Sequence, residues 1–204
     1  TMGERIDNLA WMSAETKKEA RKKLAAIDVK IGHPSKWIDY SAWQTGDSYL
    51  ETALQARRFE WHREMDKIGK SVDKTEWLMS PQTVNAYFEP LKNEIVFPAA
   101  ILQPPFFYDD ADDALNYGGI GSVIGHEMSH GFDDQGRQYD ANGNLRDWWS
   151  EEDGRRFKES AQNFVSQYAA TSPLPGLKLN GEFTLGENIA ALGGLCVSLA
   201  ALRK

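Results

Sequence analysis

Gly125-His126-Glu127-Met128-Ser129-His130-Gly131 contains the pattern H-E-x-x-H. Its flanking residues predict a helix that runs through about Phe132. On a helix, residues four apart project from one face, so both imidazoles can bind one metal ion. Glu127 follows the first histidine, where its carboxylate can take a proton from a water on that ion. The alternative is a helix with two surface histidines. We favour a zinc site, because the pattern arises by chance in a chain of this size on the order of once in a hundred, and two of the four histidines fall in it.

A catalytic zinc site needs a third protein ligand and one open position. Cys196 is a poor candidate because it lies in an apolar helical stretch, and His33 and His62 lie in ordinary settings on the other side of the motif. A carboxylate downstream of the motif remains. Glu187 stands at the start of an otherwise apolar predicted helix. From spacing alone, it is equally well explained as a metal ligand or as the acid of a capping box with Thr184.

Composition indicates a globular chain and limits the partners. The 204 residues are 41% apolar and 26% charged, with a net charge of −7, which argues weakly against nucleic acid or an anionic membrane surface as the main partner. One cysteine excludes an internal disulfide framework and a cysteine-rich zinc site. No signal-peptide pattern opens the chain, and the apolar stretch 189–202 is too short to span a bilayer comfortably. The last helix reaches Lys204 without a stop signal, so we expect a fragment of a longer protein.

The expected elements follow from periodicity and capping residues. Residues 1–70 are predicted to be largely helical. Helices are expected from Ser13 to about Ile27, from Asp47 or Ser48 through Ile68, from Ser150 to about Tyr168, and from near Thr184. Strands are expected at 29–31, 83–88 and 94–97, with a hairpin-sized loop at 89–93.

Several segments, in order, resemble the neprilysin family of zinc endopeptidases, which includes neprilysin, the endothelin-converting enzymes and bacterial PepO-type oligopeptidases. The similarity spans nearly the whole chain. It is carried by the motif with its continuation to Asp134, and by Leu9-Ala10-Trp11-Met12, Trp37-Ile38-Asp39-Tyr40-Ser41, Asn85-Ala86-Tyr87, Ile101-Leu102-Gln103-Pro104-Pro105-Phe106-Phe107 and Glu187-Asn188-Ile189-Ala190.

The resemblance implies a set of metal-site roles. One Zn²⁺ per chain is bound by His126, His130 and Glu187. Glu127 acts as general base and later returns the proton to the leaving amine. Asp133 accepts a hydrogen bond from the ring of His130 and fixes its tautomer.

The resemblance also implies how oligopeptide substrates bind. Asn85 and Ala86 hold the substrate backbone along an edge strand. Phe106 and Val123 line the apolar pocket for the residue after the scissile bond. Without the resemblance, Asn85 is a strand-end residue, and Phe106 and Val123 are core residues.

The implied fold is mixed α/β, of the α+β kind: a thermolysin-like zincin core with a small sheet flanked by the motif helix and the ligand helix. Residues 1–80 are expected to form a helical segment that joins a lid to the catalytic part, and residues 81–204 the zincin core, truncated at its C-terminus. The parent is expected to be bacterial, because this chain has a single cysteine whereas the animal members are rich in disulfides. It is expected to work in the cell envelope, the periplasm or the cytoplasm. No nucleic-acid partner or membrane segment is expected, and the oligomeric state stays open.

Two departures from the family pattern leave an alternative. The family places an Asp four residues after the ligand glutamate, where this chain has Ala191. The His and Arg that stabilise the oxyanion lie further downstream in the family. We therefore expect this chain by itself to be a poor or inactive peptidase, and a non-catalytic zinc-binding or interaction fragment is the alternative to a metalloendopeptidase.

Overall fold

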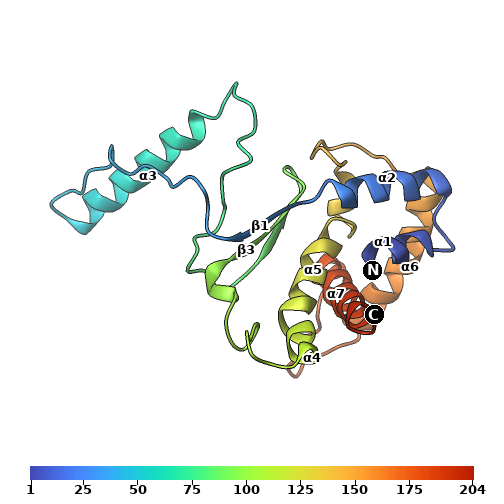
Figure 1. Cartoon of the computed structure of the whole chain (residues 1–204). Helices are drawn as coiled ribbons and strands as arrows, with labels where there is room; N and C mark the ends of the chain where they lie inside the picture. Colours follow the sequence, from blue (N-terminus) through green and yellow to red (C-terminus); the bar gives the residue numbers. More distant parts are fainter. The chain divides into compact units, whose positions relative to one another are not determined.

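The computed structural model describes residues 1–204 and divides them into two compact units (Figure 1). Thr1–His33 and Met79–Lys204 form the first unit, and Pro34–Leu78 form the second. The first 33 residues pack with the part that carries the H-E-x-x-H motif, and the expected division into residues 1–80 and 81–204 stays a prediction. The role of the N-terminal residues as a connection to a lid stays a prediction.

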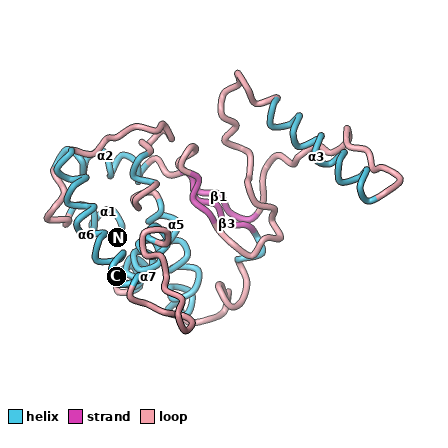
Figure 2. Tube along the Cα trace, turned by 180° about the vertical axis from the view of Figure 1, so that it is seen from behind, coloured by secondary structure: helices cyan, strands magenta, loops and turns pink.

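A small three-stranded sheet confirms the expected mixed fold (Figure 2). Its strands are β1 (Asp28–Gly32), β2 (Tyr87–Glu89) and β3 (Glu94–Pro98), in the order β1-β3-β2. The central strand β3 runs parallel to β1 and antiparallel to β2. All five residues of β3 are buried, as expected for a central strand covered on both faces.

Two serines cap helices that pack the N-terminal residues against the rest of the first unit. The helices of this region are α1 (Met2–Asp7), α2 (Ala14–Ala25) and α6 (Glu151–Ala169). Ser13 caps α2 by accepting the Thr16 N–H, and Ser150 caps α6 by accepting the Asp153 N–H. Both hydroxyls satisfy donors that a helix start leaves unpaired. A cluster of apolar side chains joins these helices, formed by Ile6, Met12, Ala20 and Trp149.

The metal motif lies on a helix that packs along the last helix of the chain. A short 3-10 turn (η1, Ala99–Ile101), α4 (Asp113–Asn116) and a π-helical turn (η2, Tyr117–Gly121) precede α5 (Ser122–His130). A second 3-10 turn (η3, Gly136–Gln138) follows it, and α7 (Leu185–Leu202) closes the chain. The two helices α5 and α7 lie side by side in both views (Figure 1 and Figure 2). The second apolar cluster lies between α5 and the sheet and contains Ala86, Ile95, Phe97, Ile101 and Ile120.

By length and composition, α7 is apolar enough to cross a membrane, with a mean hydropathy of 1.6 over 18 residues. The sequence analysis expects the apolar stretch 189–202 to be too short to span a bilayer comfortably. One such helix is weak support for a membrane span, because a core helix has the same composition. This helix also buries four of its small or apolar residues, Ala190, Gly194, Val197 and Ser198.

The second unit contains α3 (Tyr49–Met65). Ser48 and Glu51 form a complete capping box at its start. None of its residues is buried. Arg63 and Lys67 both pair with Glu76, so ion pairs connect the helix to the segment that follows it.

Several local predictions were wrong in their extent or contacts. The helix expected through Ile68 ends at Met65. The strand expected at 83–88 covers only Tyr87–Glu89. Extending its register would place Asn85 opposite Pro98, which has no N–H to donate. The motif helix ends at His130 rather than Phe132. Thr184 makes no capping bond: its hydroxyl donates to the carbonyl of Asn180 and accepts from the side-chain amide of Asn188.

Candidate metal centre

The three expected ligands meet where α5 faces the start of α7. His126 and His130 stand one turn apart on α5, with their rings nearly perpendicular and 4.5 Å between centroids. Their Nε2 atoms are 2.9 Å apart. Glu187 Oε2 lies 3.4 Å from His126 Nε2, and Glu187 Oε1 lies 3.7 Å from His130 Nε2. No other group of His, Cys, Asp or Glu side chains in the chain has the geometry to hold a metal ion.

These separations fit a zinc ion. In a tetrahedral site with bonds of about 2.1 Å, ligand atoms lie roughly 3.4 Å apart. Both distances from Glu187 to the histidines are close to that value, and the two Nε2 atoms are somewhat closer together. The side chain of Glu187 is 70% exposed, so the site is open to solvent on that side. Two imidazoles and one carboxylate are a donor set that zinc accepts, with a fourth position left open.

The electrostatic environments of the two histidines differ. Burial, and then the charge of His130, lower the pKa of His126. Burial also acts against the charged form of His130, but the hydrogen bond and the negative charge of Asp133 raise the pKa of His130 above its usual value. Asp133 Oδ2 lies 2.7 Å from His130 Nδ1. His130 Nδ1 therefore donates to Asp133, so that Nε2 is the ring nitrogen that faces the site.

Glu127 is buried beneath the edge strand β2 and beside the metal site. It is 5% exposed, and it accepts a hydrogen bond from the backbone N–H of Phe88. Burial raises the pKa of Glu127 to about 7. A carboxyl group with such a pKa can both accept and return a proton near neutral pH.

Glycines bring the ligand helix close enough for Glu187 to reach the histidines. A Cβ atom on Gly194 of α7 would lie 2.5 Å from His126 N and 2.5 Å from Ser122 O. A Cβ atom on Gly125 of α5 would lie 2.7 Å from Gly194 O. The two backbones are thus in direct contact, and side chains at these two positions would force the helices apart.

The residues expected to bind substrate lie around β2 and the second apolar cluster. Asn85 is exposed and Ala86 is buried, both just before β2. Phe106 and Val123 pack against the cluster that contains Ala86. Because the sheet order leaves β2 at an edge, its outer side can accept an extended peptide.

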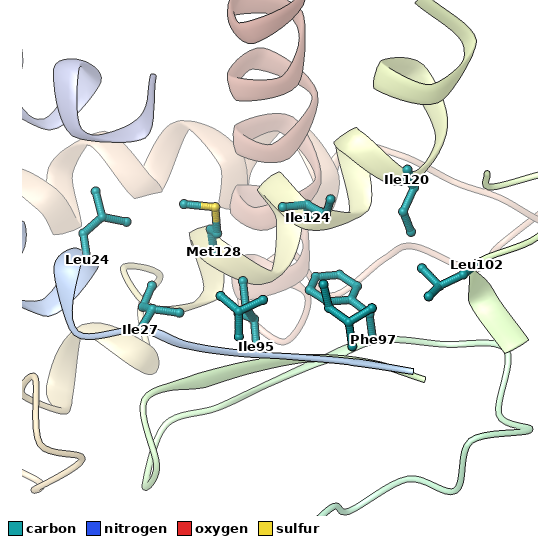
Figure 3. Close-up of a pocket in the computed structure, with 10 residues that line it drawn as sticks. Leu24, Ile27, Ile95, Phe97, Leu102, Ile120, Ile124 and Met128 are labelled. Atoms are coloured by element: carbon teal, nitrogen blue, oxygen red, sulfur yellow. The ribbon is translucent and has the colours of Figure 1, made fainter. Parts of the chain in front are cut away.

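A separate apolar pocket of about 250 Å³ lies on another face of α5. Ile95 and Phe97 of β3 face Ile124 and Met128 of α5 across it (Figure 3). Neither Phe106 nor Val123 lines this pocket.

The sequence analysis did not identify the residues that hold the candidate ligands in position. Gly125 opens the quoted motif and Gly194 lies in the apolar stretch 189–202, but a glycine has no side chain that would indicate its role. Lys23 is buried under the loop that follows the motif. Its position seven residues after Thr16 and three after Ala20, both buried on the same face of α2, is the one signal that distinguishes it from the other lysines of that helix.

Comparison with known proteins finds relatives of this chain in one peptidase family. The profile of Peptidase family M13 matches residues 85–204, and a second profile of the same description matches residues 1–34. Mouse endothelin-converting enzyme 1 is 45% identical over 202 residues, covering 94% of this chain and 26% of that protein. Human neprilysin is 44% identical over 203 residues, covering 93% of this chain and 27% of that protein.

Two solved bacterial structures have the same fold. The Mycobacterium tuberculosis zinc metalloprotease Zmp1, crystallised with an inhibitor, superposes with a TM-score of 0.93 at 47% identity, covering 98% of this chain and 32% of that one. PepO from Lactobacillus rhamnosis superposes with a TM-score of 0.90 at 37% identity, covering 98% and 32%. The chain spans about a quarter of the length of the curated relatives described above.

Proposed function

This chain belongs to peptidase family M13, and on that premise we propose that it forms the zinc-binding part of a metalloendopeptidase that hydrolyses peptide bonds in oligopeptides. The observation that carries the proposal is the convergence of His126, His130 and Glu187, with their ligand atoms all within 4.8 Å of one another, beside the buried carboxylate of Glu127. One ion per chain is expected.

The side chains around this site have different roles in the proposed reaction. Zinc, when bound, supplies a Lewis acid that polarises the scissile carbonyl and lowers the pKa of a water. Glu127 takes the proton of the attacking water on a carboxylate oxygen and returns it to the leaving amine. Asp133 keeps the proton of His130 on Nδ1, so that Nε2 stays directed at the site.

Substrate binding is proposed along the edge of the sheet. Asn85 and Ala86 hydrogen-bond the backbone of an extended oligopeptide, which would add a strand beside β2. Phe106 and Val123 receive the side chain that follows the scissile bond. The burial of Glu127 under β2 supports this placement, because a peptide on that edge lies next to the base. The whole protein is proposed to be bacterial and to work in the envelope, the periplasm or the cytoplasm, and fractionation of the source cells would test the compartment.

A second candidate function is a zinc-binding module without catalysis. The observation that favours it is at His126, whose Nδ1 atom makes no hydrogen bond, in contrast to the Asp133 bond of His130. Ala191 follows Glu187 by one turn of α7, and its methyl group cannot accept a hydrogen bond. A poorly oriented ligand weakens metal binding and catalysis together.

Metal analysis and peptide cleavage by the full-length protein separate the two functions. His126→Ala and Glu187→Ala should each lose zinc, whereas Glu127→Gln should keep zinc and lose cleavage of a quenched peptide, because the amide cannot take a proton. His62→Ala is the matched control, since His62 lies on α3. Zinc retained in both ligand variants would refute the site. A zinc-loaded protein whose cleavage is the same with Glu127→Gln would remove Glu127 as base, and a zinc-loaded protein without any cleavage would favour the module.

A further inference from the structure

Lys23 on α2 is one of the least accessible side chains in the chain, at 1% exposed. Burying an ammonium group is costly unless other groups compensate for the lost water. Lys18 and Lys22, on the same helix, are exposed. The burial of Lys23 therefore calls for a specific partner.

That partner is the backbone of the loop after the H-E-x-x-H motif. Lys23 Nζ donates to Gly136 O at 2.6 Å and to Tyr139 O at 2.7 Å. The rings of Phe88 and Phe132 also face it, with centroids 5.6 and 5.7 Å from Nζ. Two carbonyls and two aromatic faces thus replace water around the charge, and the negative charges of Asp133 and Asp140 stabilise it further.

The same loop supports a metal ligand from its other side. Asp133 Oδ1 accepts the backbone N–H groups of Gln135 and Gly136 at 2.9 and 2.7 Å. Asp133 Oδ2 lies 2.7 Å from His130 Nδ1. Gly136 also lies against the ligand's own backbone, because a Cβ atom there would be 1.7 Å from His130 O. Gly136 is therefore held by Asp133, His130 and Lys23 together.

We propose that Lys23 is a positioning residue for the metal ligand His130. By holding Gly136 and Tyr139, it fixes the loop in which Asp133 accepts the Nδ1 proton of His130, and so keeps Nε2 directed at the ion. The proposal rests on the proposed function for the identity of that ion. It assigns to the N-terminal residues, which a separate family profile matches, a part in metal binding.

The loop can fold without Lys23, which makes the proposal testable. Gly136 O also accepts the Tyr139 N–H at 3.1 Å. Tyr139 O also accepts the indole N–H of Trp148 at 3.0 Å. Removing the ammonium group leaves neither carbonyl without a donor, so the main loss is the connection to α2.

The test compares Lys23→Met with Lys18→Met, a matched change on an exposed lysine of the same helix, in the full-length protein. Lys23→Met should weaken zinc binding about 10-fold to 100-fold in a chelator competition, as other losses of support behind a ligand do. In the zinc-free protein, nitrogen-15 NMR of the histidine rings should show that His130 no longer holds a single Nδ1-protonated tautomer. Lys18→Met should change neither measurement.

A purely structural lysine would give a different result. If Lys23→Met lowers the unfolding temperature but leaves the zinc dissociation constant within twofold and the His130 tautomer unchanged, the proposal is wrong. If Lys23→Met does not fold, Lys23→Gln takes its place with the same expectations, because its side chain is one bond shorter and cannot reach both carbonyls at hydrogen-bond distance. If the starting protein binds no zinc, the proposed function fails, and the tautomer measurement still decides the role of Lys23.

Discussion

Replacing Gly194 by alanine should separate the ligand helix from the motif helix and weaken zinc binding. The added Cβ atom would meet His126 N and Ser122 O at 2.5 Å and His126 Cα at 2.9 Å. All three are backbone atoms of α5, so no side-chain rotation relieves the contact. Carbon and its neighbours need about 3.5 Å. The helices must therefore separate by roughly 1 Å at this position.

The shift reaches the metal site because Glu187 lies on the same rigid helix. It is seven residues before Gly194, which is about 10 Å along the axis. A displacement on the order of 1 Å at a reacting group lowers a reaction rate about 100-fold, and lost support behind a metal ligand lowers metal affinity about 10-fold to 100-fold. Crowding a packed interior costs about 1–3 kcal/mol of unfolding free energy. We expect zinc affinity to fall about 10-fold to 100-fold and the protein to lose a few kcal/mol of stability at most.

The assay is a chelator competition for the zinc dissociation constant, with a urea unfolding curve on the same sample. Gly118→Ala is the control, because a Cβ atom there has no other atom within 4 Å. Gly193→Ala should lie between them, since its Cβ atom meets only the side chain of Ser129, at 2.7 Å from Oγ. If Gly194→Ala binds zinc and unfolds as Gly118→Ala does, direct contact between the helix backbones does not position Glu187.

Two further predictions concern the orientation of His126 and the hydrogen bonds to Asp153. Ala191→Asp should tighten zinc binding about 10-fold to 100-fold by giving the ring of His126 a carboxylate partner, whereas Leu192→Asp, which adds the same charge at the next, exposed position, should not; equal affinities would show that His126 needs no such partner. Burial alone would raise the pKa of Asp153, but hydrogen bonds from Ser13, Thr16 and Ser150 lower it to about 2. Because this folded-state pKa lies below the usual value of 3.8, the stabilisation is present above about pH 4 and disappears as the pH falls towards 2, by about 2 kcal/mol. Urea unfolding of Asp153→Asn should show a flatter pH dependence in that range, and an unchanged slope would contradict the assignment.

The local half of the metal site could be predicted from the sequence, because helix geometry alone places His126 and His130 on one face. The third ligand could not be predicted from spacing, which explained Glu187 equally well as a capping residue. The structure shows why the capping explanation fails. Thr184 lacks the extended backbone angles of a usual cap residue, with φ −96° and ψ 7°, and makes no side-chain capping bond. The carboxylate of Glu187 is directed at the histidines instead.

The support behind the site depends on tertiary contacts that sequence patterns do not record. Lys23 belongs to a helix rich in lysine, and its spacing from Thr16 and Ala20 distinguishes it only once those two residues are known to be buried. The strand expected at 83–88 is shorter because its pairing with β3 ends at Tyr87 opposite Val96, and the sequence does not show where that pairing ends. The two glycines at the contact between α5 and α7 matter because of the atoms opposite them, and those atoms lie far away in the sequence.

Each of the three candidate ligands is supported in a different way. Glu187 is placed by backbone contact between two helices. His130 is oriented by Asp133 and a loop that α2 holds through Lys23. His126 has the backbone contact of Gly194 behind it but no hydrogen bond on Nδ1. Ala191 lies on α7 between Glu187 and Gly194, and both of these residues lie against His126. A carboxylate at position 191 would therefore give His126 the kind of support that Asp133 gives His130. The difference in zinc affinity between Ala191→Asp and the starting protein therefore measures how much the orientation of one histidine contributes to this site.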